Sequence, residues 1–242
     1  MLEKKPSKMK QIRIFLFTTS LLFFCNTALQ AQTATDSIQF QEKFGIRVGI
    51  DLSKPLRTIL DEDYSGFEIL GDYRLYKNYY LAAEIGNEKM NYREDNLSVT
   101  STGSYIKLGV DYNAYDNWAG MENMIFVGLR YGFATFSQTL NEYAIYTDTK
   151  FFPPNIVQGP FETSGLTASW AELIVGMKVE LFNNIYLGAN VQVKRMVTQS
   201  RPANFDNLTI PGFNRTYDES SFGVGYGYTI SYLIPLYKKA RD

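Results

Sequence analysis

The chain has 242 residues, with 24 basic and 25 acidic side chains, one cysteine and no histidine. Without histidine, Ser-His and Cys-His catalysis and histidine-based metal sites are excluded. A single cysteine cannot form an internal disulfide, and a net charge of −1 does not favour nucleic acid as a partner. The length suits one domain.

The first 31 residues have the pattern of a secretory signal peptide. Five basic residues occur within the first 13 positions, and an apolar run from Ile14 to Cys25 precedes the sequence Thr-Ala-Leu-Gln-Ala-Gln. The run of about 12 residues is too short for a membrane helix, which needs about 20. We therefore expect cleavage after Ala31, with residues 32–42 left as a short periplasmic tail.

Eight later segments alternate between apolar and polar residues, the period of a β-strand. The last of them reads Phe-Gly-Val-Gly-Tyr-Gly-Tyr-Thr-Ile-Ser-Tyr-Leu-Ile-Pro-Leu, with large side chains on one face and glycine, threonine or serine on the other. This is the reverse of a soluble core and favours a strand whose large side chains face lipid. The predicted strands cover residues 43–53, 66–76, 79–86, 106–113, 125–134, 172–181, 185–194 and 222–236.

Long and short connections alternate between these strands. Residues 54–65, 93–103, 138–165 and 199–220 are predicted to be loops, whereas 77–78, 115–123 and 183–184 are short turns. Outer-membrane barrels have short periplasmic turns and long outward loops. The sequence therefore predicts an all-β fold, an eight-stranded antiparallel up-and-down transmembrane β-barrel over residues 43–237, with both ends periplasmic and a short tail, 238–242.

Charged residues share the other, inward face of the predicted strands. Eight strands leave an interior only wide enough for side chains, and the two signs nearly cancel, so we expect a lumen closed by ion pairs. Aromatic residues Phe67, Tyr105, Phe133, Phe136, Trp170 and Phe222 are predicted to form a girdle near the loop end. The predicted ion-pair network comprises Arg47, Asp51, Glu68, Asp72, Arg74, Glu84, Lys107, Asp111, Arg130, Glu172, Lys178, Glu180 and Lys194.

The signal peptide, the strands of the type Phe-Gly-Ile-Arg-Val-Gly-Ile-Asp and the long C-terminal strand carry a resemblance. Over about residues 40–237 the chain resembles small outer-membrane barrels of the Bacteroidota, including a family known only as a domain of unknown function. The resemblance implies outer-membrane lipid and the barrel-assembly machinery as partners, the latter through the last strand. Its motifs are periodicities, so it assigns no site residues.

The function predicted from these features is structural or surface-binding, carried by the outward loops of a monomer. Phe151, Phe152 and Phe161 in the longest loop are candidate contact residues. No enzyme activity, cofactor or metal is expected. The alternatives are a small passive channel, a lipid-modifying outer-membrane enzyme and a soluble lipocalin-like barrel.

Overall fold

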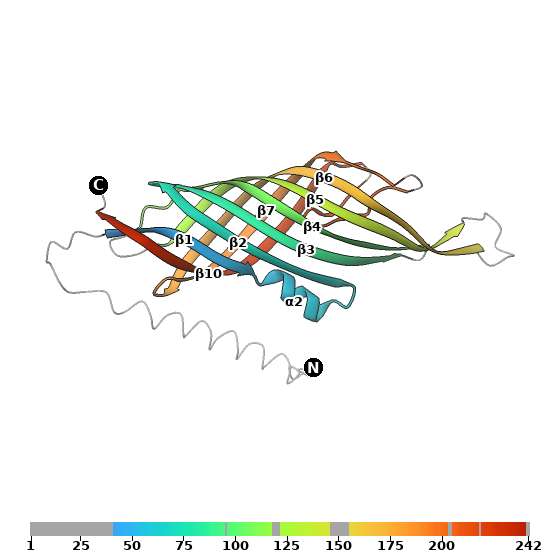
Figure 1. Ribbon diagram of the computed structural model, residues 1–242, viewed down its shortest axis with the longest axis horizontal. Coiled ribbons are helices and arrows are strands. Elements are labelled where there is room, and N and C mark those ends of the chain that lie inside the picture. Colours follow the sequence, from blue (N-terminus) through green and yellow to red (C-terminus); the bar gives the residue numbers. More distant parts are fainter. Residues whose placement is uncertain are drawn as a thin grey trace, which may run out of the picture. The chain divides into compact units, whose positions relative to one another are not determined.

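The computed structural model describes residues 41–94, 96–117, 122–145, 155–202, 205–217 and 219–240. Eight antiparallel strands form a closed ring (Figure 1), in which the first strand pairs with the last. The ring strands are β1 (Gln41–Asp51), β2 (Tyr64–Tyr76), β3 (Tyr79–Glu94), β4 (Leu97–Asn113), β5 (Met124–Ile145), β6 (Asn155–Phe182), β7 (Ile185–Gln199) and β10 (Phe222–Ala240). The prediction of an all-β, eight-stranded antiparallel barrel is confirmed; the predicted signal peptide and most of the periplasmic tail lie outside the described residues.

The two faces of the wall follow the predicted alternation. On β5, Leu129 points outward and is 65% exposed, while its neighbour Arg130 points inward and is 6% exposed. The same alternation of exposed aliphatic or aromatic residues with buried polar residues recurs on β2, β3, β4, β6, β7 and β10. The ring therefore carries an apolar outer belt around a polar interior, the opposite of a soluble barrel.

Three predicted loops are wrong. Residues 93–103 belong to β3 and β4, and most of 138–165 belongs to β5 and β6, because the strands continue with serine, threonine and asparagine where the apolar pattern stops. Residues 54–65 include the helix α2 (Ser53–Leu60). Pro55 lies in its first turn, where a missing N–H leaves no helical hydrogen bond unmade, so the proline did not exclude a helix. Within the described residues, no helix is long and apolar enough to cross a membrane.

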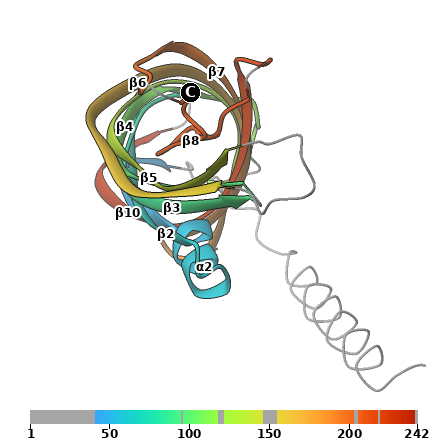
Figure 2. The same cartoon turned by 90° about the vertical axis from the view of Figure 1, so that its right-hand side faces the viewer.

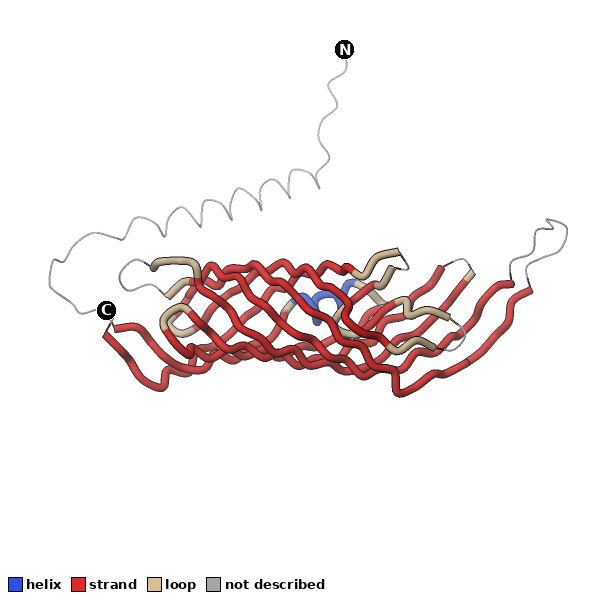
Figure 3. Tube along the Cα trace, turned by 90° about the horizontal axis from the view of Figure 1, so that it is seen from above, coloured by secondary structure: helices blue, strands red, loops and turns tan. Residues whose placement is uncertain are grey.

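The extended strands form a projection that we call the wing, made of residues 87–94, 97–104, 135–145 and 155–167. β4 pairs with β5 as far as Leu97 opposite Tyr143, and β5 pairs with β6 as far as Ile145 opposite Asn155. Figure 1 and Figure 3 show the β5–β6 hairpin reaching beyond the other strands on the loop side. The wall of the barrel is therefore much taller on one side than on the other.

The connection between β7 and β10 folds back over the loop-side opening. It contains two short strands, β8 (Thr209–Ile210) and β9 (Asn214–Arg215), which pair with each other. We call residues 205–217 the plug, and Figure 2 shows β8 lying within the ring of strands. The carbonyl of Thr209 accepts hydrogen bonds from Ser101 Oγ and Gln138 Nε2, both at 3.0 Å. This predicted loop is therefore a cover for the lumen.

Candidate functional site

The interior of the barrel begins, toward the turn end, with Asp72 and the two cations that contact it. This carboxylate on β2 accepts from Arg47 Nε of β1 at 2.8 Å and from Lys178 Nζ of β6 at 2.6 Å. All three side chains are buried. Arg47 lies directly opposite Asp72 on the neighbouring strand, so this ion pair runs along the wall. Lys178 reaches Asp72 from β6, on the far side of the ring, so the second ion pair crosses the lumen.

The network continues toward the loop side through Asp111 and Arg130. Asp111 lies 4.0 Å from Lys178 and 2.7 Å from Arg130 Nη1, and Arg130 Nε also contacts Glu84 at 3.2 Å. Glu84 then pairs with Lys107 Nζ at 2.7 Å. Lys107 also lies 3.2 Å from Glu68 and 3.8 Å from Glu172. Each cation of this chain thus has at least one buried carboxylate in direct contact.

These contacts join nine of the thirteen predicted residues into one connected set. Buried charges are costly unless they are paired, and here opposite signs alternate along the axis. A cavity beside Glu84, Arg130 and Lys178 measures about 30 Å³, room for about two water molecules. The connected residues are Arg47, Glu68, Asp72, Glu84, Lys107, Asp111, Arg130, Glu172 and Lys178.

Two more of the predicted residues, Asp51 and Lys194, have partners other than those predicted. They form hydrogen bonds with backbone groups and are not part of the ion-pair chain. Asp51 accepts from the N–H groups of Ser53 at 2.8 Å and Tyr228 at 3.2 Å, where β1 ends. Lys194 donates to the carbonyl of Gly212 at 2.6 Å. Alternation placed both side chains inward correctly but did not identify these backbone partners.

Arg74 and Glu180 find partners that were not predicted, at the turn end. Arg74 Nη2 contacts Glu42 at 2.8 Å, and Glu180 contacts Lys43 Nζ at 3.1 Å. Glu42 was assigned to the periplasmic tail, but β1 begins at Gln41. The first strand is therefore longer at its start than the apolar pattern indicated, and it supplies both missing partners.

A polar cavity of about 120 Å³ lies below this group at the turn end. Its inner wall includes Arg47, whose guanidinium lies 5.1 Å from the ring centre of Tyr80 and 5.0 Å from that of Tyr186. The two aromatic rings and Asp72 hold this arginine across the lumen. The cavity is therefore a vestibule that ends at the ion-pair chain.

The loop-side mouth is filled by apolar side chains. Trp170 is 0% exposed, and its ring lies edge-on to that of Phe213 of the plug, with centroids 5.9 Å apart. A Cβ at Gly132 would lie 2.3 Å from the Trp170 ring, so the glycine makes room for the indole. The cluster contains Tyr105, Ala134, Phe136, Leu166, Ala168, Trp170, Ile210 and Phe213.

This cluster corrects the predicted loop-end girdle. Tyr105, Phe136 and Trp170 point inward and are buried, whereas Phe67, Phe133 and Phe222 are exposed on the outside. The three inward residues share the alternation of the charged residues on their strands, so the pattern itself placed them inside. The girdle prediction counted aromatic residues near strand ends without applying that alternation.

Gly212 fastens the plug to the barrel. Its N–H donates to Glu88 Oε2 at 2.8 Å, while its carbonyl accepts from Lys194. It has a φ of +78°, and a Cβ there would lie 2.6 Å from the Tyr105 ring. A positive φ and this close approach both require glycine. We call Gly212, Glu88 and Lys194 the clasp; only Lys194 was predicted.

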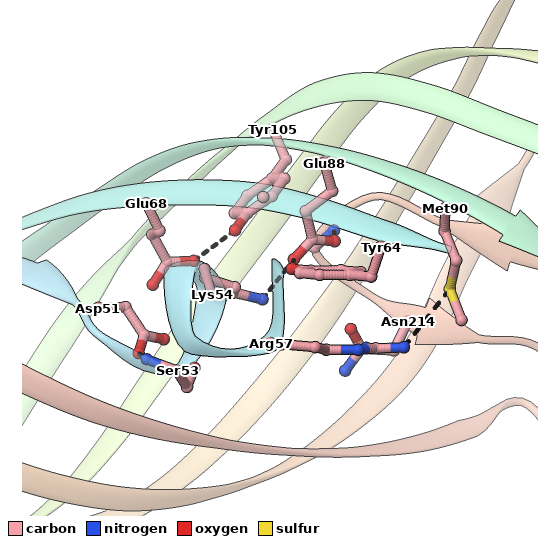
Figure 4. A network of polar contacts seen from close by, with 12 residues as sticks. Asp51, Ser53, Lys54, Arg57, Tyr64, Glu68, Glu88, Met90, Tyr105 and Asn214 are labelled. Atoms are coloured by element: carbon pink, nitrogen blue, oxygen red, sulfur yellow. Dashed lines mark hydrogen bonds and ion pairs between the residues drawn. The ribbon is translucent and has the colours of Figure 1, made fainter. Parts of the chain in front are cut away.

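Glu88 also connects the plug to α2 and β2. Figure 4 shows Lys54 of α2 directed toward Glu88, with which it forms an ion pair, and Tyr64 OH donates to the same carboxylate at 2.8 Å. Burial opposes the charged form of Lys54, but the nearby carboxylates of Glu88 and Glu68 outweigh it and raise the pKa of Lys54 above its ordinary value. The helix is thereby tied to the clasp.

The comparisons assign the chain to a family. A family model described as Domain of unknown function (DUF6048) matches residues 9–239. The chain belongs to this family. A search of curated proteins finds no match.

Two solved structures are similar to the chain. The attachment invasion locus protein Ail of Yersinia pestis is 7% identical, with a TM-score of 0.38, over 79% of this chain and 97% of that one. CarO2 of Acinetobacter baumannii is 10% identical, with a TM-score of 0.35, over 80% of this chain and 99% of that one.

The candidate contact residues of this family member are only partly described. Phe151 and Phe152 lie outside the described residues. Phe161 belongs to β6, opposite Leu140 of β5, and is 49% exposed. It is therefore a residue of the wing and not of a loop. Among the described residues, no cluster of three or more acidic, cysteine or histidine side chains is placed to hold a metal ion.

Proposed function

We propose that the chain is an integral outer-membrane β-barrel with a closed lumen, and that its role is structural or surface-binding and is carried by the loop side. The observation that supports this most strongly is the polarity of the wall. Exposed residues such as Leu108, Leu129 and Val175 form an apolar belt outside, while Lys107, Arg130 and Glu172 fill the inside. Lipid is the surrounding in which such a wall is stable.

A soluble lipocalin-like barrel is disfavoured by the same observation. Such a barrel would need an apolar lumen for its ligand and a polar exterior. Here the lumen holds buried ion pairs, and the exterior of β10 presents Val224, Tyr226 and Tyr228, each more than half exposed. In water this belt would be a large aggregation-prone surface.

A passive channel is disfavoured by how the lumen is filled. The ion-pair chain crosses the middle, and the plug with Trp170 and Phe213 covers the loop-side mouth. A selective pore would be expected to present a ring of one charge sign around open space. Because the interior is occupied, the wing and the outer surface of the plug are the parts that can contact other molecules. A monomer is sufficient for this role. We expect the barrel-assembly machinery to insert it by recognising β10.

The membrane location is tested by fractionation and gel mobility. Because every strand in the ring is paired on both sides, we expect the protein to stay with outer membranes after carbonate washing and to migrate differently in detergent before and after heating. Release by carbonate together with identical migration would refute the membrane barrel.

A pair of arginine substitutions tests the lipid face directly. Leu129→Arg lies in the apolar belt and should cost about 2 to 4 kcal/mol of unfolding free energy in vesicles. Asn155→Arg, on the exposed tip of the wing, is the matched control and should change stability little. Equal tolerance at both positions would show that β5 does not meet lipid.

Conductance distinguishes the closed barrel from the channel. The purified barrel in planar bilayers should give no steady single-channel currents, because buried ion pairs and the plug occupy the lumen. Reproducible currents from the wild-type protein would contradict the closed lumen and favour the channel.

A further inference from the structure

The outer face of the wall changes its chemistry at one level on three neighbouring strands. The row Ile85, Ile106 and Phe133 is aligned across β3, β4 and β5 by strand pairing, and all three are exposed. The next outward row is Asn87, Ser104 and Thr135, also aligned and exposed. The apolar belt therefore ends at a sharp line, and the wing begins on its far side.

Beyond that line the outer face of the wing is polar and mostly uncharged on its two central strands. From Ser98 to Ser104 on β4 and from Thr135 to Asn141 on β5, each outward position carries a hydroxyl or amide group and is exposed or half-exposed. The exposed carboxylate of Glu142, opposite Ser98, follows at the outer end of the face. Surfaces that face water commonly contain roughly 25–35% charged residues, so eight neutral positions in a row are unusual. These positions are Ser98, Thr100, Thr102, Ser104, Thr135, Ser137, Thr139 and Asn141.

Several of these side chains are ordered by hydrogen bonds between strands. Asn87 Nδ2 donates to Ser104 Oγ at 3.0 Å. Thr100 Oγ1 donates to Asn91 Oδ1 at 3.0 Å and accepts from Asn141 Nδ2 at 3.0 Å. A sheet whose side chains are already fixed loses little conformational entropy when it binds a partner.

The height of this face exceeds the reach of phospholipid headgroups. β5 runs from Phe133, the last belt residue, to Ile145. At about 3.3 Å per residue and a tilt near 40°, this segment rises roughly 30 Å above the belt. The headgroup layer on one side of a bilayer is only about 5–8 Å thick. Most of the face must therefore meet either bulk water or a taller headgroup.

Basic residues lie where the face borders the belt. Lys89 follows Asn87 on the outer face of β3 and lies opposite Thr102 of β4. Arg195 is on β7, two strands from β5, in the same register row as Ala171 of β6 and the belt residue Tyr131. Both are exposed. Cations at this depth suit phosphate groups, and the neutral hydroxyl and amide groups above them suit sugar hydroxyls, which both donate and accept hydrogen bonds.

We propose that the outer face of the wing binds the oligosaccharide headgroup of a phosphorylated glycolipid in the leaflet that surrounds the barrel. This inference rests on the proposed membrane location and adds the chemistry of the partner. A protein partner fits less well, because tight protein interfaces are anchored by buried aromatic residues, and the outward positions of β4 and β5 in the wing offer none.

Cysteine labelling of the full chain in vesicles tests the proposal. In a Cys25→Ser background, Thr102→Cys and Ser137→Cys report on the face, and Glu219→Cys, exposed beside the plug, is the control. Each variant is labelled with a water-soluble maleimide in phosphatidylcholine vesicles, in vesicles containing lipid A, and in vesicles containing lipopolysaccharide. We expect labelling at positions 102 and 137 to slow about tenfold with lipopolysaccharide, as for a surface covered about 90% of the time, while position 219 is unchanged.

A Leu129→Cys variant separates this inference from the membrane location. If position 129 reacts rapidly in all vesicles, the barrel is not in the bilayer and the proposed function fails. If position 129 is protected but 102 and 137 react equally with and without lipopolysaccharide, only the glycolipid inference is overturned. Equal protection by lipid A, which lacks the outer sugars, would also overturn it.

Discussion

The middle of the lumen and its loop-side mouth are filled in opposite ways. In the middle, Asp72, Asp111 and Glu84 alternate with cations from both neighbouring and facing strands. At the mouth, Trp170 and Phe136 meet Phe213, which comes from a connection between strands. A ring of eight strands can close its centre with its own long side chains, but where the ring opens toward the wing, a separate segment is needed to complete the packing.

The difference predicts different responses to truncation. In the ion-pair chain, removing one member leaves a buried charge without its partner, and the cost comes mainly from that charge. In the apolar mouth, removing a side chain leaves a cavity, and the cost depends on how far the plug can collapse into it. Substitutions in the two regions can therefore test whether the lumen is dry throughout.

The largest effect is expected from Arg130→Met. Arg130 contacts both Asp111 and Glu84, so the variant leaves two carboxylates short of a cation and should lose about 3 to 5 kcal/mol of unfolding free energy. Urea titration in phospholipid vesicles, followed by the fluorescence of the tryptophans, measures this loss.

The neighbouring outward residue gives the control for this substitution. Leu129→Met changes an exposed, outward side chain to one of similar volume and should cost little. A loss of only about 0 to 1 kcal/mol for Arg130→Met would resemble that of an exposed pair. It would mean that water fills the middle of the lumen while the mouth is dry.

Phe213→Ala should have the next largest effect. The ring is 2% exposed and packs on Trp170, and its removal should cost about 3 kcal/mol, near the low end for a buried phenylalanine because a loop can partly close the gap. Phe222→Ala, at an exposed outward position, is the control. Increased maleimide labelling of Ala168→Cys, a small buried position in the same cluster, in the Phe213→Ala background would report the opened mouth, and unchanged stability would show that the plug is not part of the packing.

The middle of the lumen was largely predictable from the sequence, because alternation decides which side of a strand each residue occupies. Arg130 and Leu129 are adjacent, so their opposite faces follow from the strand period alone. The pattern gave no partners, since these depend on strand register, and it missed that Lys194 bonds to Gly212. Gly212 lies in the connection between β7 and β10, where apolar and polar residues do not alternate.

The mouth and the wing were predicted poorly for a related reason. The wing inverts the polarity of the wall, with Val99 and Leu140 buried inside and threonine or serine outside. A search for apolar outward residues therefore ends the strands too early. The same alternation continued through Thr135 and Phe136 would have extended β5 and placed that phenylalanine inside.

The smallest of the expected effects, at the junction of the two regions, is that of Lys54→Met. Lys54 is one of three groups that contact Glu88, and Tyr64 and the N–H of Gly212 remain after its removal. The loss should therefore be about 2 kcal/mol, below that of Arg130→Met.

The effect of Lys54 should also depend on pH, because the folded protein raises the pKa of Lys54 above 10.5. The free energy that the charged lysine adds to folding is fully present below about pH 10 and is lost as the pH rises through the raised pKa. Unfolding free energies of the wild type and Lys54→Met between pH 7 and pH 12 measure this, with Lys89→Met, an exposed residue of β3, as the control. If the two unfolding free energies differ by the same amount across the whole pH range, Lys54 acts through the packing of its side chain and not through its charge. The clasp would then resemble the apolar mouth and not the ion-paired middle of the lumen.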